Sequence, residues 1–251
     1  FPVPISITLL YSMPGNSCIT DRILNDYSRT TDGMSEFKSL RCHMIILFNG
    51  TSSAGKTTVA RVMQEKYDRV LLLYGMDTMV QMAFPEKCDY PPFDEQAIKL
   101  IPGEKEGYPH AQLVVSPYMY PVYATAVKFY KMLSDQGYDL IVDELLFNEN
   151  RISAYFDILS DERIYFIGLK PEKSVVVRRE EERGDRIPGL AAGLYDEVYN
   201  PLFTYDLLLD TGTLTPEESA DKILEFIDNN SVPAGFRTSA NTWLQQQPRY
   251  N

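Results

Sequence analysis

The residues best suited to chemistry form a glycine-rich stretch that begins at Gly50. It fits the pattern of a glycine, four further residues, and then glycine, lysine and serine or threonine, which is typical of a loop that binds nucleotide phosphates. Backbone N–H groups and the positive end of a helix converge on an anion in such a loop. We expect Lys56 to contact the β- and γ-phosphates of ATP and Thr57 to ligate Mg²⁺. The predicted nucleotide-binding residues are Gly50, Thr51, Ser52, Ser53, Ala54, Gly55, Lys56, Thr57 and Thr58.

The sequence on either side of this loop predicts the elements that must position it. Residues 44–49 are a short apolar run with the length and composition of a buried parallel strand. Residues 58–66 contain neither glycine nor proline and place Val59, Val62 and Met63 on one helical face. Strand, glycine-rich loop and helix form the context that the phosphate-binding motif requires, so a chance glycine-rich turn is the weaker interpretation.

Two acidic residues follow later apolar strands and are candidates for catalysis and metal binding. Asp77 comes after the predicted strand 70–74, at the sheet edge where ligands bind in open α/β folds. It either takes the proton from an acceptor hydroxyl or caps the next helix, and its position alone favours neither role. The predicted strand 139–144 ends in two acids, of which Asp143 is expected to hold Mg²⁺ and Glu144 is a candidate for orienting the substrate. The alternative for this strand end is a solvent-exposed acidic turn.

Three arginines near the end of a later predicted helix are candidates for contacting phosphate. Arg179 and Arg183 lie four residues apart on one helical face, and Arg186 follows shortly after the helix. A guanidinium group matches phosphate oxygens, so a lid over residues 179–191 can neutralise charge on the transferred group. The alternative is a solvated network in which the glutamates at 180–182 pair with these arginines. In a chain that also carries the phosphate-binding motif, the lid is the better interpretation.

Five apolar strands alternate with helical segments, and the phosphate-binding loop follows the first of them. This order predicts an α/β fold with a doubly wound, mainly parallel five-stranded sheet of the P-loop NTPase or kinase type, with an arginine-bearing lid. We expect one P-loop kinase domain over residues 44–230. Within it, residues 84–117 are rich in proline, glycine and aromatic residues, which predicts either an acceptor-site insertion or an irregular surface insertion.

The two ends of the chain differ in composition from this domain. Residues 1–43 show little periodicity and precede Met44, so we interpret them as a poorly ordered N-terminal extension. Residues 231–251 are polar and contain Pro233 and Pro248, so we interpret them as a loosely attached C-terminal tail.

Charge and composition narrow the functional classes. The formal net charge is −11, which disfavours nucleic acid as a partner because a polynucleotide-binding face is normally basic. No apolar run is long enough to span a bilayer, so no membrane partner is expected. The three cysteines lack CxxC spacing, which suits a reducing cytoplasm, and the two histidines are too few for a histidine-based metal cluster.

Residues 44–228 resemble the chloramphenicol phosphotransferase-like family of P-loop kinases. The resemblance rests on four stretches: the phosphate-binding motif, Tyr-Gly-Met-Asp ending at Asp77, Ile-Val-Asp-Glu around Asp143, and Arg-Glu-Glu-Glu-Arg-Gly-Asp-Arg beginning at Arg179. It implies an enzyme that transfers the γ-phosphate of ATP to a hydroxyl of a small molecule.

The resemblance also implies roles for single residues. It makes Asp77 the general base, and it makes Arg179, Arg183 and Arg186 bind the ATP phosphates or stabilise the transition state. The motif ends in Lys-Thr where the family usually has Lys-Ser, and either hydroxyl can bind Mg²⁺. Residues 84–117 do not look like the matching family segment, so the resemblance does not identify the acceptor.

Three functional hypotheses follow. The first is an ATP- and Mg²⁺-dependent O-phosphotransferase that acts on a small-molecule hydroxyl. The second is a kinase whose acceptor is a nucleotide, a sugar-nucleotide or an RNA end. The third is a regulatory module that binds ATP without turnover, against which the intact residues Lys56, Thr57, Asp77 and Asp143 argue. The sequence does not indicate the oligomeric state.

Overall fold

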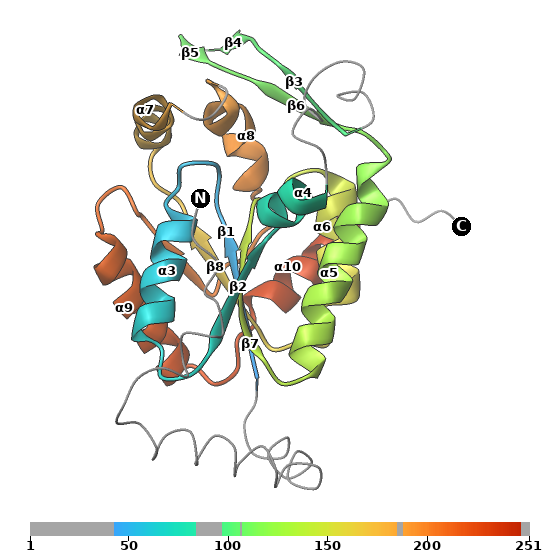
Figure 1. Cartoon of the computed structure of the whole chain (residues 1–251), viewed down its shortest axis with the longest axis vertical. Helices are drawn as coiled ribbons and strands as arrows, with labels where there is room; N and C mark the ends of the chain where they lie inside the picture. The colour runs from blue at the N-terminus through green and yellow to red at the C-terminus, as the bar shows by residue number, and fades with distance from the viewer. Residues whose placement is uncertain (1–42, 84–96, 106, 185–187, 247–251) are drawn as a thin grey trace, which may run out of the picture. The chain divides into compact units, whose positions relative to one another are not determined.

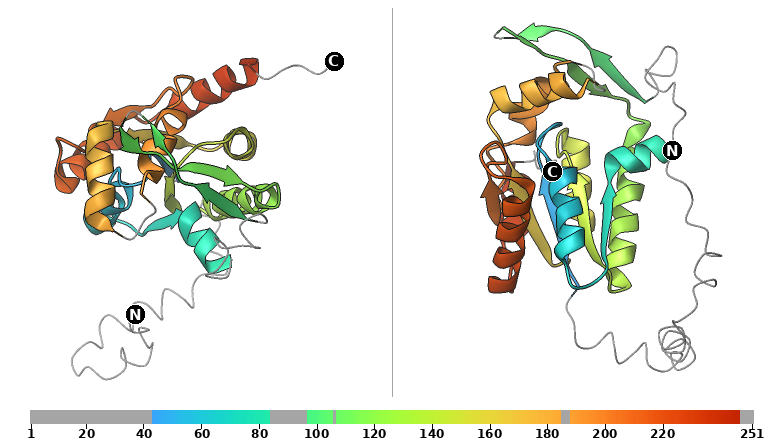
Figure 2. Two further views of the ribbon diagram at one scale, coloured as in Figure 1. Left: turned by 90° about the horizontal axis from the view of Figure 1, so that it is seen from above. Right: turned by 60° about the vertical axis from the view of Figure 1, so that its left-hand side comes forward.

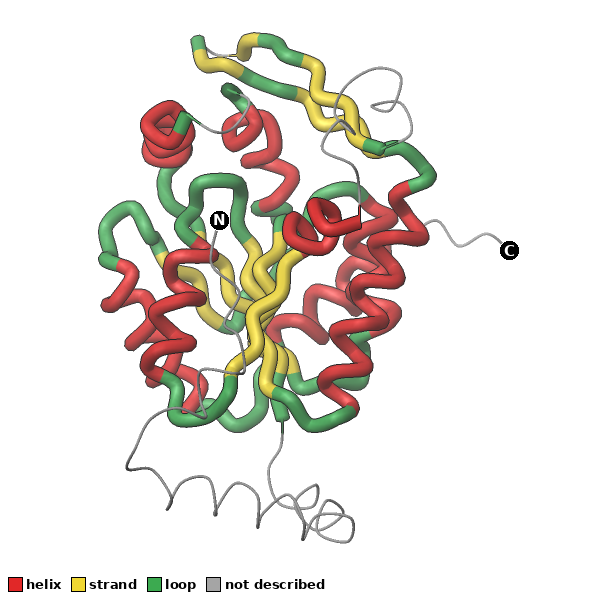
Figure 3. Tube along the Cα trace, viewed as in Figure 1, coloured by secondary structure: helices red, strands yellow, loops and turns green. Residues whose placement is uncertain are grey.

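Five parallel strands form the sheet on which the domain is built. A computed structural model describes residues 43–83, 97–105, 107–184 and 188–246, so the predicted extension over residues 1–43 lies, except for His43, outside the described residues. The strand order is β2-β7-β1-β8-β9, and all neighbouring pairs are parallel, which confirms the predicted sheet. Because all pairs are parallel, their carboxyl ends share one edge of the sheet, and Figure 3 shows the strands side by side between the helices. The strands are β1 (Ile45–Asn49), β2 (Leu71–Gly75), β7 (Asp139–Glu144), β8 (Ile164–Leu169) and β9 (Leu207–Leu209).

Helices cover both faces of this sheet, as the doubly wound arrangement requires (Figure 1). All residues of β1 are buried, and alternate side chains of the strand enter the two cores because successive side chains point to opposite faces. One core receives α3 (Lys56–Lys66) and α9 (Pro216–Asn229). The other core receives α4 (Met76–Ala83), α5 (Met119–Asp135), α6 (Glu149–Ile158), α8 (Leu190–Val198) and α10 (Gly235–Gln246).

The bounds of the remaining helices follow from local sequence. Helix α7 (Lys173–Arg183) ends at Gly184, whose φ of 67° is the left-handed conformation that glycine adopts readily. Helix α9 begins with a capping box in which the Thr215 hydroxyl accepts from the Glu218 N–H and the Glu218 carboxylate accepts from the Thr215 N–H. No helix in the described part of the chain is both long enough and apolar enough to cross a membrane.

The described part of the proline- and glycine-rich insertion is a β-hairpin. Strands β3 (Ile98–Ile101) and β6 (Gln112–Val115) pair antiparallel, and β4 (Glu104–Lys105) and β5 (Tyr108–Pro109) continue the pairing toward the tip. The hairpin lies above the carboxyl ends of the parallel strands, next to α8 (Figure 2). The alternative of an irregular surface insertion is therefore wrong for residues 98–105 and 107–115, whereas residues 84–96 and 106 lie outside the described residues.

The expectation of a loosely attached tail is wrong for most of residues 231–251. Helix α10 buries Phe236, Ala240 and Trp243 in the main hydrophobic core, where Phe236 packs edge-on against Phe156 at 5.1 Å between ring centroids. The Asp206 carboxylate accepts hydrogen bonds from two N–H groups at the start of this helix. The buried side chains recur at helical spacing, and the exposed residues Arg237, Thr238 and Asn241 lie between them, which explains the polar composition of the segment.

Candidate active site

The phosphate-binding motif lies between β1 and α3, at the carboxyl edge of the sheet (Figure 1). Gly55 precedes α3 with a φ of 86°, which only glycine adopts without strain. Among the described residues, no side chain caps this helix and none in its first turn is acidic, so its N–H groups and its dipole can act on an anion. A Cβ atom on Gly50 would lie 2.7 Å from the carbonyl oxygen of Leu169, so this position also requires glycine.

Ser53 in the middle of the loop has an unusual conformation. Its φ of 61° is left-handed, which costs a non-glycine residue on the order of 1–3 kcal/mol. Its hydroxyl oxygen is buried and has no hydrogen-bond partner among the described residues. Such strain and such unpaired groups concentrate where a ligand completes the structure. The loop therefore fits a nucleotide phosphate group, whose oxygens would accept from this hydroxyl and from the loop amides.

The lysine, threonine and aspartate that the sequence predicts for phosphate and metal binding meet at one point. The Thr57 hydroxyl donates to Oδ2 of Asp143 at 2.5 Å, and Lys56 Nζ lies 3.5 Å from Oδ1 of the same carboxylate. They come together because β1 and β7 are paired neighbours and both end at this edge. Lys56 Nζ also donates to the carbonyl oxygens of Gly50 and Thr51, at 2.8 and 3.1 Å, so its side chain folds back over the loop.

The oxygen atoms at this point suit Mg²⁺. This cation typically takes one or two protein oxygens and completes its shell with substrate phosphates and water. The Thr57 hydroxyl and the Asp143 carboxylate supply such a pair. Among the described residues, no group of three or more His, Cys, Asp or Glu side chains could hold a metal ion by itself. The donor set therefore fits a cation that binds together with nucleotide phosphates.

Asp77 lies at the same edge, across from Asp143. Helix α4 begins at Met76, so Asp77 lies inside its first turn and not at the position before the helix. Gly75, two residues earlier, pairs with Asp143 in the register of β2 and β7. Burial raises the pKa of Tyr123, the positive charge of Arg151 opposes this shift, and the negative charges of Glu144 and Asp77 add to it. Asp77 is itself exposed, as a group that meets a substrate must be.

The predicted arginines are not equivalent in the structure. The Arg179 guanidinium donates to the carbonyl oxygen of Thr211 at 2.7 Å, and its Nη1 would lie 3.9 Å from a Cβ atom on Gly55. It therefore lies beside the phosphate-binding loop. Arg183 is exposed in the last turn of α7, and Arg186 lies outside the described residues. Of the three predicted arginines, Arg179 is the one that these distances place beside the loop.

Several residues that the sequence analysis did not single out fix the loop in place. The Thr51 N–H donates to the Tyr199 hydroxyl at 3.2 Å, and the Thr51 hydroxyl donates to the Ala191 carbonyl oxygen at 3.1 Å. These bonds favour an anchoring role for Thr51 over the nucleotide-contacting role expected from the sequence. On the other flank, the Thr211 hydroxyl donates to the Ala54 carbonyl oxygen at 2.7 Å. The anchors lie far away in sequence, so no local pattern indicates them.

Glu144, the neighbour of Asp143, points away from the loop into a buried polar cluster. Its carboxylate accepts hydrogen bonds from Arg151 and from Tyr155, and its side chain has no exposed surface. Burial raises the pKa of Tyr155, and the charge of Glu144 adds to this effect. The hydroxyl of the buried residue Tyr130 has no partner among the described residues. The substrate-orienting role that the sequence suggested for Glu144 is wrong, because the side chain is enclosed by protein.

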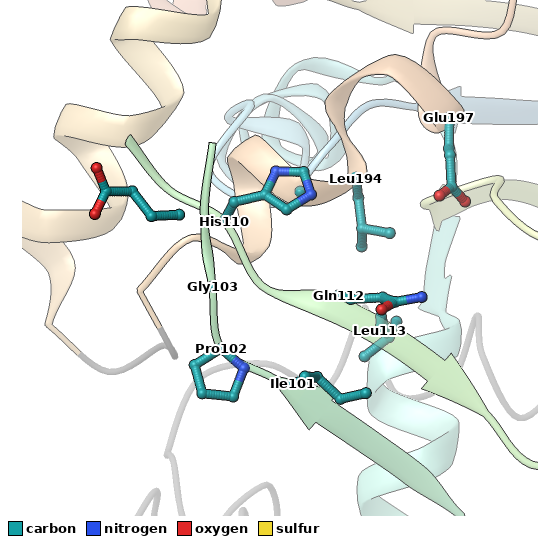
Figure 4. Close-up of a pocket in the computed structure, with 10 residues that line it drawn as sticks. Ile101, Pro102, Gly103, His110, Gln112, Leu113, Leu194 and Glu197 are labelled. Carbon is teal, nitrogen blue, oxygen red and sulfur yellow. The ribbon is translucent and has the colours of Figure 1, made fainter. Parts of the chain in front are cut away.

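A pocket of about 300 Å³ lies between the hairpin and α8. Leu194 and Glu197 of α8 point toward Gln112 and Leu113 of the hairpin (Figure 4). Within the described part of the chain, none of its lining residues belongs to the phosphate-binding loop or to the strand ends that carry Asp77 and Asp143. The pocket is therefore separate from the candidate active site.

Comparison with known proteins identifies the family. The family model described as "Chloramphenicol phosphotransferase-like protein" matches residues 43–228. The chain belongs to the chloramphenicol phosphotransferase-like family. Two strains of Mycobacterium tuberculosis have a curated relative that carries the provisional name of an O-phosphotransferase. Each is 25% identical over 207 residues, which cover 80% of this chain and 89% of the relative.

Solved structures add that this family member has a P-loop kinase fold. The APS kinase CysC of Mycobacterium tuberculosis, in complex with AMPPNP and APS, aligns with a TM-score of 0.52 at 13% identity, covering 74% of this chain and 98% of the kinase. A sugar kinase from Janibacter sp. also gives a TM-score of 0.52, at 16% identity, covering 75% of this chain and 95% of the kinase. At these identities the likeness establishes the fold. Family and fold together indicate a kinase-type phosphotransferase.

Proposed function

We propose that this protein is an ATP- and Mg²⁺-dependent O-phosphotransferase that moves the γ-phosphate of ATP to a hydroxyl of a small molecule. The observation that carries the proposal is the convergence of Lys56, Thr57 and Asp143 at the phosphate-binding loop, with Asp77 at the end of the neighbouring strand. A phosphate-binding group, a pair of oxygens for Mg²⁺ and an accessible carboxylate are the parts that phosphoryl transfer requires.

The phosphate-binding side is expected to hold the nucleotide and to stabilise charge. The ammonium group of Lys56 and the amides of the loop bind the β- and γ-phosphates, in place of the two carbonyl oxygens that Lys56 now contacts. Mg²⁺, bound by Thr57 and Asp143, would neutralise charge on the same phosphates. The Arg179 guanidinium, held by the Thr211 carbonyl oxygen, adds positive charge beside Gly55.

Asp77 is the proposed general base. It must reach the acceptor hydroxyl, and its exposed position at the carboxyl edge of the sheet allows this. A carboxylate that accepts the hydroxyl proton during attack on the γ-phosphorus lowers the barrier to transfer. Because α4 begins before Asp77, the structure supports this role over the capping role.

The charge of the protein supports a small acceptor over a polynucleotide. A net charge of −11 adds repulsion against a polyanionic acceptor such as RNA.

The test is transfer of labelled γ-phosphate from ATP with Mg²⁺ to a panel of small molecules with hydroxyl groups, chloramphenicol included. Wild-type protein is compared with Asp77→Asn and with the control Asp161→Asn, an exposed aspartate just before β8 at the opposite edge of the sheet. We expect transfer that is lost in Asp77→Asn and kept in the control. Transfer only to nucleotides or RNA ends would favour the second hypothesis, and ATP binding without transfer or phosphate release would favour a binding module.

A further inference from the structure

Glu180 differs from the glutamates that follow it on α7. Glu181 and Glu182 are exposed, and Glu182 lies 3.8 Å from Arg178 on the surface. Glu180 is 3% exposed and has no such partner among the described lysines and arginines. A charged group is costly to bury unless hydrogen bonds compensate it, so its contacts define its role.

Both carboxylate oxygens of Glu180 bind the N-terminus of α8. Oε2 accepts from the Gly189 N–H at 2.7 Å, and Oε1 accepts from the Ala191 N–H at 2.8 Å. The start of a helix has free N–H groups and a positive dipole, so a carboxylate there is strongly bound. Arg179, the preceding residue on α7, lies beside Gly55 of the phosphate-binding loop. Glu180 therefore ties α8 to the segment that carries the phosphate-contacting arginine.

Helix α8 is also bound to the phosphate-binding loop. The Ala191 carbonyl oxygen accepts a hydrogen bond from the Thr51 hydroxyl of the loop. The N–H of the same residue donates to Glu180, so Ala191 connects the two. The Tyr199 hydroxyl, just after α8, accepts from the Thr51 N–H and donates to the Leu169 carbonyl oxygen at 2.6 Å. A change in the conformation of the loop must therefore alter these hydrogen bonds at α8.

The opposite side of α8 is packed against the hairpin, backbone to backbone. The Ala111 N–H donates to the Gly189 carbonyl oxygen at 2.9 Å. A Cβ atom on Gly189 would lie 2.5 Å from the His110 nitrogen, and one on Gly193 would lie 2.0 Å from the Ala111 carbonyl oxygen. Both glycines are needed for this close approach. The hairpin thus moves with α8.

We infer that Glu180 is a positioning residue that couples nucleotide binding to the hairpin over the acceptor side. Arg179 links the phosphate-binding loop to α7, and Thr51 links the loop to α8. Glu180 holds these two helices in a fixed position relative to each other. The backbone contacts at Gly189 and Gly193 then make the position of the hairpin depend on the position of α8. The inference rests on the proposed function in one respect, namely that the loop binds a nucleotide.

The experiment measures amide hydrogen exchange of the full chain with and without the non-hydrolysable analogue AMPPNP and Mg²⁺. In the wild type, the analogue should slow exchange in the loop (50–58) and also in the hairpin (108–115), the latter by about fivefold or more if the coupling has the usual size. In Glu180→Gln, the loop should stay protected while the effect on the hairpin falls below about twofold. Glutamine keeps the shape, but its NH₂ group faces an N–H donor, so one of the two bonds is lost.

Matched variants separate this role from a general loss of stability. Glu182→Gln changes an exposed glutamate of the same helix and should behave as wild type. Gly193→Ala interrupts the path at its other end, and it should also remove the hairpin effect while the loop stays protected. Equal loss of protection in loop and hairpin in both Glu180→Gln and Gly193→Ala would indicate a merely structural role and overturn the inference.

The wild type alone already tests the inference. Protection of the loop without protection of the hairpin would contradict the coupling and leave the proposed function intact. Absence of protection in the loop would contradict nucleotide binding, and the coupling would fail with it. Hairpin protection that is unchanged in Glu180→Gln would show that another path carries the coupling, which also overturns the role of Glu180.

Discussion

Asp143 and Glu144 are neighbours at the end of β7, and their carboxylates serve different surroundings. Asp143 points toward α3, where it meets Thr57 and Lys56. Glu144 points to the other face of the sheet, where Arg151 and Tyr155 enclose it. Alternation along a strand explains the split, because successive side chains of a strand point to opposite faces.

The two surroundings differ in whether the central carboxylate is open to a ligand. On the loop side, the Ser53 hydroxyl has no partner among the described residues and the N-terminus of α3 is uncapped by any of them, so a ligand can complete the site. On the side of Glu144, the carboxylate is enclosed and its hydrogen bonds go to protein, although the Tyr130 hydroxyl and Nε of Arg151 have no partner among the described residues. The loop side is therefore arranged for binding, whereas the enclosed carboxylate on the other side is arranged for rigidity.

The largest expected effect is a loss of phosphate transfer, without a large loss of stability, when Asp143 on the binding side is changed. Asp143→Asn removes the negative charge next to Thr57, so Mg²⁺ with the ATP phosphates is held less firmly, and the rate of γ-phosphate transfer should fall about a thousandfold. The thermal midpoint should fall less than in the Glu144 variant below, because Lys56, the charged partner of Asp143, also donates to two carbonyl oxygens of the loop. Transfer rates at increasing Mg²⁺ concentration check this. An unchanged rate and Mg²⁺ dependence would remove Asp143 from the site.

Glu144→Gln is the matching substitution on the rigid side, and its main expected effect is on stability. It leaves the Arg151 guanidinium buried without its counter-charge, and breaking a buried pair in this way typically costs about 3–5 kcal/mol of unfolding free energy. Urea unfolding of the variant beside Glu182→Gln, an exposed glutamate, measures the difference. A loss below about 1 kcal/mol, within the range of surface substitutions or typical mutations, would mean that the cluster is not needed for rigidity.

The binding side could be predicted from the sequence because its chemistry is local. The motif from Gly50 to Thr57 carries its loop, its helix and its lysine within one short stretch, and Asp143 is marked by the apolar strand before it. Glu180 could not be placed in this way. Its charged neighbours suggest a surface helix, and its burial depends on Gly189, which approaches only in the fold.

Two other elements were missed for different reasons. Helix α10 did carry a signal, since Phe236, Ala240 and Trp243 follow helical spacing, but the polar residues between them concealed it. The hairpin had a weaker signal, because its strands are short and its contact with α8 uses backbone atoms at Gly189 and Gly193. Sequence patterns report side chains, so a contact between backbones leaves little trace in them.

Arg179 sharpens the comparison from the loop side. Arg179→Ala removes the guanidinium beside Gly55, and γ-phosphate transfer should fall about a hundredfold. Arg178→Ala is the control, because Arg178 is exposed on the same helix. Single-turnover rates of both variants with saturating ATP check this. Equal rates for the two variants would return the arginines to the solvated network that the sequence left open.

The smallest expected effect concerns a third acid of β7, Asp139, at the amino end of the strand. It is buried, forms an ion pair with Arg69 and accepts a hydrogen bond from the Tyr67 hydroxyl at 3.2 Å. Burial raises the pKa of Tyr67 to about 12 from its usual 10.0, and the negative charge of Asp139 adds to the shift. The folded protein therefore keeps this proton at a pH where the unfolded chain has released it.

This sets the sign of the pH dependence. The contribution of Tyr67 to stability is complete below pH 10 and is lost as the pH rises toward 12. In Tyr67→Phe, the unfolding free energy should therefore fall less steeply between these pH values, by up to one proton in the slope. Urea unfolding at several alkaline pH values, with the exposed residue Tyr138 changed to phenylalanine as the reference, measures the slope. A slope equal to that of the Tyr138→Phe reference would mean that burial and the charge of Asp139 do not raise the pKa of Tyr67 in the folded protein.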